Sequence, residues 1–148
     1  MSVFTLLAGC ASSGYNLEEA ISKWIAYPIS DIVHIEELQE GAVVFYLSPK
    51  DDHDLPAVAF FRKTEKGGWI GVGPLDLLDF RGGKLFFDWI TADLNSGETH
   101  DERVQVIYGQ INDPNITELK VRSTDNKFVN VEIIEIPDGR FYFYRWKI

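Results

Sequence analysis

The stretch FYFYRW, residues 141–146, places large aromatic side chains on both faces of a β-strand. A strand with one face in solvent would alternate apolar with polar residues, so we expect this strand to be central in a sheet or covered on both sides. Large aromatic side chains supply most of the core area of small β domains. An exposed aromatic binding strip is the alternative interpretation of the same stretch.

The chain before this strand is a series of similar short runs. From Ile29 onward, runs rich in Val, Ile, Phe, Tyr and Trp are separated by turn signals such as Lys66-Gly67-Gly68 and Pro137-Asp138-Gly139. These turns are too short for crossover helices, so neighbouring strands should pair antiparallel. We expect strands at residues 32–38, 42–47, 57–64, 69–72, 84–90, 103–110, 117–122, 128–136 and 140–147.

One helix precedes the strands. Asn16 and Glu19 form a capping-box pattern, and apolar residues then recur at helical spacing over residues 17–26, up to Pro28. A second, brief helical turn is expected after Gly73-Pro74, at residues 76–80.

Residues 91–102 form the longest stretch that shows neither the helical spacing nor the strand-like alternation of apolar residues. This stretch is the best internal boundary. It separates residues 16–95, read as the N-terminal helix packed on an antiparallel sheet, from residues 103–148, read as a four-stranded antiparallel β subdomain. Four such short strands are marginal alone, so the two parts should share a core. The fold class is therefore α+β, mostly β.

Composition restricts the classes of function. Fourteen basic against 23 acidic residues give a net charge of −9 with no basic cluster, so nucleic acid is an unexpected partner. No apolar run approaches the roughly 20 residues that span a bilayer, so we expect no transmembrane helix. The single cysteine excludes an intramolecular disulfide and a CxxC metal motif.

The histidines offer little chemistry. His34, His53 and His100 fall in no metal-binding or nucleophile motif, and His34 is expected on the surface of its strand. The loop containing Asp51, Asp52, His53 and Asp54 could contact a divalent cation, but it lacks an EF-hand ligand pattern. We expect no metal, no cofactor and no catalytic residues, and retain this loop as a possible binding surface.

Carboxylate pairs are the remaining acid–base candidates. Asp76 with Asp79, or Asp88 with Asp93, are close in sequence, yet nothing in the sequence indicates a raised pKa.

The N-terminus contains a processing motif. Leu7-Ala8-Gly9-Cys10 resembles the lipobox of bacterial lipoproteins, here of the small uncharacterised Gram-positive type, and residues 11–14 resemble the tether that follows it. The resemblance implies removal of the residues before Cys10 and a lipid on its thiol, with residues 1–15 as signal remnant and tether. Because no Lys or Arg precedes Cys10, we expect the natural start codon upstream of Met1.

The leading hypothesis is a lipid-anchored, extracytoplasmic protein of the bacterial cell envelope, without catalysis, that reaches the membrane through Cys10. Its partner would be a protein, a peptide or an envelope polymer. One alternative is a secreted surface hydrolase using carboxylates of the 51–54 and 98–102 loops. The other is a cytosolic β-rich binding or inhibitor domain with Cys10 in its core.

Overall fold

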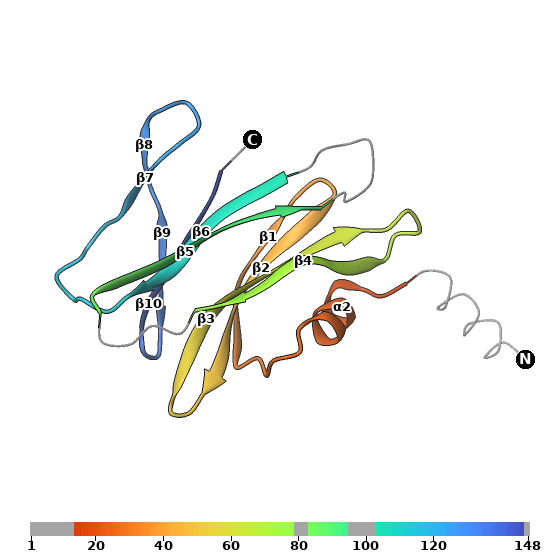
Figure 1. The fold of residues 1–148 in the computed structure, drawn as a ribbon, viewed down its shortest axis with the longest axis horizontal. Helices are drawn as coiled ribbons and strands as arrows, with labels where there is room; N and C mark the ends of the chain where they lie inside the picture. The colour runs from red at the N-terminus through yellow and green to blue at the C-terminus, as the bar shows by residue number, and fades with distance from the viewer. Residues whose placement is uncertain (1–13, 79–82, 95–102, 147–148) are drawn as a thin grey trace, which may run out of the picture.

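The structure, a computed structural model, describes residues 14–78, 83–94 and 103–146. Figure 1 shows its elements, one helix and ten strands in the described residues. Their bounds are α2 Leu17–Trp24, β1 Asp31–Glu37, β2 Gly41–Lys50, β3 His53–Lys63, β4 Trp69–Leu77, β5 Leu85–Asp93, β6 Arg103–Ile111, β7 Lys120–Arg122, β8 Phe128–Asn130, β9 Glu132–Ile136 and β10 Gly139–Trp146.

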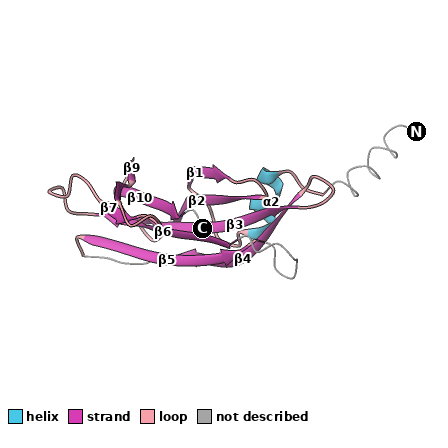
Figure 2. Ribbon diagram, turned by 90° about the horizontal axis from the view of Figure 1, so that it is seen from above, coloured by secondary structure: helices cyan, strands magenta, loops and turns pink. Residues whose placement is uncertain are grey.

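The strands form two four-stranded antiparallel sheets and one hairpin. Sheet A has the order β1-β2-β3-β4, sheet B has the order β5-β6-β10-β9, and β7 pairs only with β8. The mostly β character and the antiparallel pairing confirm the fold class expected from the sequence. Figure 2 shows β4 and β5 along one edge of the molecule, with β1 and β9 at the other.

The two sheets share one core. Its central cluster joins Phe45 and Phe60 of sheet A to Tyr108, Phe141 and Phe143 of sheet B. Phe45 stacks on Phe143 with ring centroids 4.5 Å apart, so aromatic contacts cross the interface between the sheets. The cluster contains residues from before and after the stretch 91–102, among them Phe60 and Val106.

The division between the sheets falls earlier in the chain than the sequence boundary at residues 91–102. Strand β5 pairs along its length with β6, from Leu85 opposite Ile111 to Asp93 opposite Arg103. Sheet B therefore takes its first strand from the N-terminal part. The run expected at 128–136 is also two strands, because β8 turns back onto β7 and β9 continues along β10.

The helix begins with the predicted capping box. Asn16 Oδ1 accepts the Glu19 N–H at 2.8 Å, and Glu19 Oε1 accepts the Asn16 N–H at 3.1 Å. The helix ends at Trp24, before Pro28, and packs Ala20 and Ile21 on the outer face of sheet A.

Two local expectations are wrong. The helical turn expected at 76–80 is strand as far as Leu77, where β4 continues past Gly73 at φ +69°; residues 79–80 lie outside the described residues. His34 is half-buried and stacks on Phe143, with ring centroids 4.6 Å apart. A register shift between Ile32 and His34 breaks the strict alternation and turns this side chain toward sheet B.

Candidate functional site

The outer face of sheet B is only partly covered. Its β9 side carries Val131 and Tyr142, which pack with Leu119 and Val121 of the segment leading into and through the β7–β8 hairpin. The β5 side has no such cover among the described residues. Figure 1 shows the hairpin at the β9 end of the molecule, away from α2.

The uncovered part of this face is aromatic. On β5, inward Ile90 and Ala92 alternate with outward Phe87 and Trp89, whose side chains are 55% and 58% exposed. On β10, Tyr144 and Trp146 point the same way and are half-buried. We call these four residues the aromatic face: Phe87, Trp89, Tyr144 and Trp146.

Three rings of the aromatic face, those of Trp89, Tyr144 and Trp146, are in contact. Trp89 stacks on Trp146 with centroids 5.5 Å apart and planes 23° apart, and Tyr144 meets Trp146 edge to face at 5.2 Å. Trp146 Nε1 donates a 2.7 Å hydrogen bond to the Arg122 carbonyl of the hairpin. The guanidinium of Arg122 lies 4.7 Å from the ring centroid of Phe128, a side chain that is 63% exposed. Contacts within the protein therefore orient Trp89, Tyr144 and Trp146.

A glycine shapes the sheet beneath the rings. A Cβ on Gly109 would lie 1.8 Å from the Phe86 carbonyl oxygen, so only glycine permits this close approach of β5 and β6. Tyr142, opposite Gly109 on β10, donates its hydroxyl to the same carbonyl at 2.8 Å. Burial raises the pKa of the Tyr142 hydroxyl, which stays protonated and keeps this bond.

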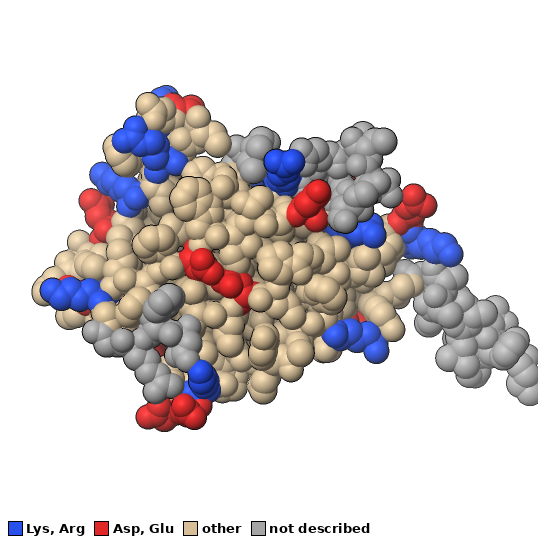
Figure 3. Space-filling view, in the orientation of Figure 1, with Lys and Arg blue, Asp and Glu red and all other residues tan. Residues whose placement is uncertain are grey.

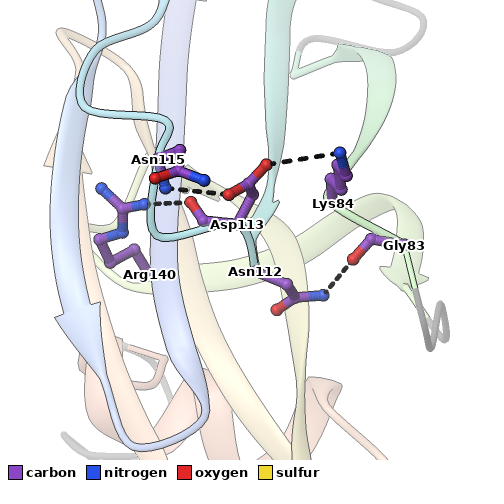
Figure 4. A network of polar contacts seen from close by, with 6 residues as sticks. All are labelled: Gly83, Lys84, Asn112, Asp113, Asn115 and Arg140. Carbon is purple, nitrogen blue, oxygen red and sulfur yellow. Dashed lines mark hydrogen bonds and ion pairs between the residues drawn. The ribbon is translucent and has the colours of Figure 1, made fainter.

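A polar network closes one end of sheet B (Figure 4). Asn112 Nδ2 donates to the Gly83 carbonyl at 3.2 Å, and the Asp113 carboxylate lies 3.9 Å from Lys84 Nζ. Arg140 Nη2 donates to the Asp113 carbonyl at 2.8 Å. These contacts join the starts of β5 and β10 to the loop after β6, so they fix the strands that carry the aromatic face.

The aromatic face has the composition of a binding surface. Trp, Tyr and Arg are the residues that most often contribute large binding energies at protein interfaces, and contiguous exposed apolar patches mark interaction sites. Stacked Trp rings also offer flat π-faces to ring-shaped partners. The arrangement supplies contact area and orientation for a partner.

A pair of carboxyl groups lies elsewhere, where β4 runs beside β5. Asp76 of β4 hydrogen-bonds Asp88 of β5, and the Tyr108 hydroxyl donates to Asp76 Oδ2. Figure 3 views the side where β4 and β5 lie in front, and shows an acidic patch in the middle of a broad uncharged surface.

Asp76 is the member of this pair whose pKa is raised. Burial, together with the hydrogen bond to Asp88, raises the pKa of Asp76 to about 6, and the Tyr108 hydroxyl opposes the shift. Burial, followed by the bond to Asp76, raises the pKa of Tyr108, which stays a donor. Sequence reasoning considered both aspartates but paired each with a neighbour in the chain, since pairing across two sheets leaves no local signal.

The loop proposed as a binding surface is partly engaged in the fold. The Asp54 N–H donates to Asp138 Oδ2 at 3.1 Å, and Asp54 Oδ1 accepts the Ser30 hydroxyl at 2.9 Å. His53 Nδ1 lies 3.4 Å from Asp52 Oδ1, and Asp51 takes a left-handed backbone at φ +55°. Asp54 thus connects β3 to the β9–β10 turn, while the Asp52 side chain is 98% exposed.

Several predicted sites lie outside the described residues. Cys10 and the 98–102 loop, with His100, are among them. In the described ranges, no group of three or more His, Cys, Asp or Glu side chains is placed to hold a metal ion. No helix in those ranges has the length and apolar character needed to cross a membrane.

The sequence reasoning did not single out Phe87 or Trp89. The signal is present, since Leu85, Phe87 and Trp89 alternate with residues that face the core. The stretch 141–146 was expected to form a central strand, and the position of β10 between β6 and β9 confirms this. Tyr144 and Trp146 of this strand are nevertheless only half-buried, and they belong to the aromatic face.

Comparison with known proteins gives no relative: no family model, no curated protein and no solved structure matches this chain.

Proposed function

We propose that this chain is a binding protein of the bacterial cell envelope, anchored outside the cytoplasm by a lipid on Cys10, that binds its partner through the aromatic face. The partner is a protein, a peptide or an envelope polymer. The observation that carries the binding role is the aromatic face, in which Phe87 and Trp89 are exposed and the rings of Trp89, Tyr144 and Trp146 are in contact.

The lipid anchor rests on the motif Leu7-Ala8-Gly9-Cys10. A lipid also suits a body of net charge −9, which an anionic membrane surface repels. A tethered body of this kind stays in solution beside the membrane and keeps its aromatic face available to neighbours.

Two experiments test the two parts separately. For the anchor, the full gene is expressed in a bacterium with labelled palmitate, and Cys10→Ala should abolish incorporation. Equal labelling of the wild type and Cys10→Ala overturns the anchor.

For the aromatic face, co-sedimentation with purified cell-wall sacculi and with envelope membranes is measured for Phe87→Ser/Trp89→Ser. Retention should fall at least about tenfold, because two exposed aromatic anchors are lost. Tyr27→Ser is the matched control, since Tyr27 is a 43% exposed aromatic residue outside the aromatic face. Equal retention of the double variant and the wild type contradicts the binding role of this face.

The hydrolase alternative requires the 51–54 and 98–102 carboxylates in one pocket. The Asp54 contacts to Ser30 and Asp138 join β3 to other parts of the fold and add nothing in its favour.

A further inference from the structure

Strand β5 is an edge strand that carries none of the usual protections against an added strand. In the described part of the chain, the edges of the two large sheets are β1, β4, β5 and β9. Strand β1 contains a register shift between Ile32 and His34, β4 contains Pro74, and β9 has only five residues. Bulges, proline and short length keep an edge from pairing with another chain. The nine residues of β5, Leu85–Asp93, include no proline and pair with β6 without a register shift.

The free edge of β5 offers backbone groups to an added strand. In an antiparallel ladder every second residue bonds the neighbouring strand, and the residues between them point their N–H and C=O groups away from it. Trp89 donates its N–H to Asp88 Oδ1 at 2.8 Å, so its backbone points to the free edge. Phe87 and Thr91, two residues before and after Trp89, point the same way. Outside the β5–β6 ladder, the described residues supply no backbone hydrogen bond to Phe87 or Thr91.

The exposed side chains of β5 favour a short, extended partner. Phe87 and Trp89 of the aromatic face belong to this strand and are more than half exposed. Together they expose roughly 250 Å², whereas each partner in a stable complex of folded proteins buries about 800 Å². A single extended segment suits this area better than a second folded chain does.

The inner face of the same edge carries an acidic pair. Asp88 of β5 and Asp76 of β4 are hydrogen-bonded to each other, and both are half-buried. Figure 3 shows an acidic patch within a broad uncharged surface on this side of the molecule. A side chain on the inner face of an added strand, opposite Asp88, lies beside this pair, so a lysine or arginine fits there. A second copy of β5 would bring another aspartate pair to the same place, and the two pairs would repel each other.

Asp88 also caps the edge. Its Oδ1 accepts the Trp89 N–H, the group to which a carbonyl oxygen of an added strand would bind. A cation opposite Asp88 attracts this carboxylate and leaves the Trp89 N–H to the added strand. One basic residue of the partner therefore both neutralises the acidic pair and makes the edge accessible.

We propose that the partner contributes an extended peptide segment that pairs antiparallel with β5. A lysine or arginine of that segment lies against Asp76 and Asp88, and the apolar side chains on either side of it pack on Phe87 and Trp89. In this mode of recognition the backbone ladder supplies affinity and alternate side chains supply specificity. The inference rests on the proposed binding role of the aromatic face and names the class of partner: a polypeptide segment in which a basic residue lies between apolar ones.

Blocked heptapeptides serve as probes. The sequence TTVKVTT places its lysine opposite Asp88 and its valines opposite Phe87 and Trp89, and the control peptide has norleucine in place of lysine. Each is titrated into the ¹⁵N-labelled protein, and the backbone amide resonances are followed by NMR. We expect the lysine peptide to shift the resonances of Phe87, Trp89 and Thr91 saturably, with a Kd on the order of a millimolar or tighter. The norleucine peptide should bind about fivefold more weakly, since it has no charge to pair with the aspartates.

Methylated peptides test the backbone pairing. N-methylation of the two valines removes the N–H groups that would face β5, and it should abolish binding. N-methylation of the two threonines beside the valines removes N–H groups that face away from β5, and it should weaken binding less than about threefold. At saturation with the unmethylated lysine peptide, hydrogen exchange of the Phe87 and Thr91 amides should slow about fivefold or more.

Two variants test the charge. Asp76→Asn/Asp88→Asn should remove the preference for the lysine peptide over the norleucine peptide, because both carboxylates are lost. Asp52→Asn is the matched control and should leave the preference unchanged, because it removes a carboxylate that is 98% exposed and lies outside β4 and β5.

The titrations of the wild type decide the proposal even where the double variant does not fold. Absence of a saturable shift at the β5 amides, equal affinity for the lysine and norleucine peptides, or equal loss of affinity with methylated valines and methylated threonines overturns it. An unchanged preference in a folded Asp76→Asn/Asp88→Asn protein does the same. Equal retention of Phe87→Ser/Trp89→Ser and the wild type on sacculi and membranes contradicts the proposed function, whatever the peptides show.

Discussion

Replacing Asp76 with Asn should make the protein more stable at pH 8 and leave its stability unchanged near pH 4. Burial raises the pKa of Asp76 from 3.8 to about 6, with the Asp88 hydrogen bond acting in the same direction. At a pH between 3.8 and about 6, Asp76 keeps its proton in the folded protein and has lost it in the unfolded chain. The free energy of unfolding of the wild type therefore falls as pH rises from about 4 to 6.

The raised pKa of Asp76 sets the size of the change in the free energy of unfolding. The rise of the Asp76 pKa from 3.8 to about 6 corresponds to roughly 3 kcal/mol if no solvent screens the group. Asp76 is only partly buried, so screening reduces this to about 1–1.5 kcal/mol. The side-chain amide introduced by Asp76→Asn would carry no charge, would still accept the Tyr108 hydroxyl, and would offer an N–H to Asp88.

The measurement is urea unfolding of both proteins at pH 4, 5, 6, 7 and 8 and constant ionic strength, followed by tryptophan fluorescence. The difference in unfolding free energy between variant and wild type should grow by about 1–1.5 kcal/mol across this range. Asp52→Asn is the control, because it removes the same charge from a side chain that is 98% exposed. A flat difference for Asp76→Asn, or a variant less stable at pH 8, would refute the reasoning.

Three further substitutions test the local geometry, each by urea unfolding. Gly109→Ala should cost at least about 3 kcal/mol, because its Cβ would meet the Phe86 carbonyl oxygen at 1.8 Å; a loss below about 1 kcal/mol would contradict the close approach. Tyr142→Phe should cost about 1 kcal/mol through loss of its 2.8 Å hydrogen bond, and no change would show that bond to be unimportant. Asn16→Ala should cost about 1 kcal/mol and Asn16→Ser much less, because serine still caps the helix; equal losses would argue against the capping box.

Neither the aromatic face nor the Asp76–Asp88 pair could be predicted from the sequence alone. Phe87 and Trp89 follow a period-2 pattern that the sequence displays, but the pattern does not say which of the two faces another element will cover. The covered face depends on where the β7–β8 hairpin packs. Among the described residues, the hairpin and the segment before it cover only the β9 side of sheet B. The Asp76–Asp88 pair depends likewise on β4 and β5 running side by side, although they belong to different sheets.

The sequence by itself determined the elements: the helix after Asn16, most of the strands, their antiparallel pairing through short turns, and the mostly β class. Each of these depends on residues near one another in the chain, through capping, side-chain period and turn length. Only the tertiary structure decided that β5 joins β6, that a register shift turns His34 inward, and that Trp89 stacks on Trp146. Those outcomes depend on contacts between residues far apart in the chain, which the local pattern of either partner does not specify.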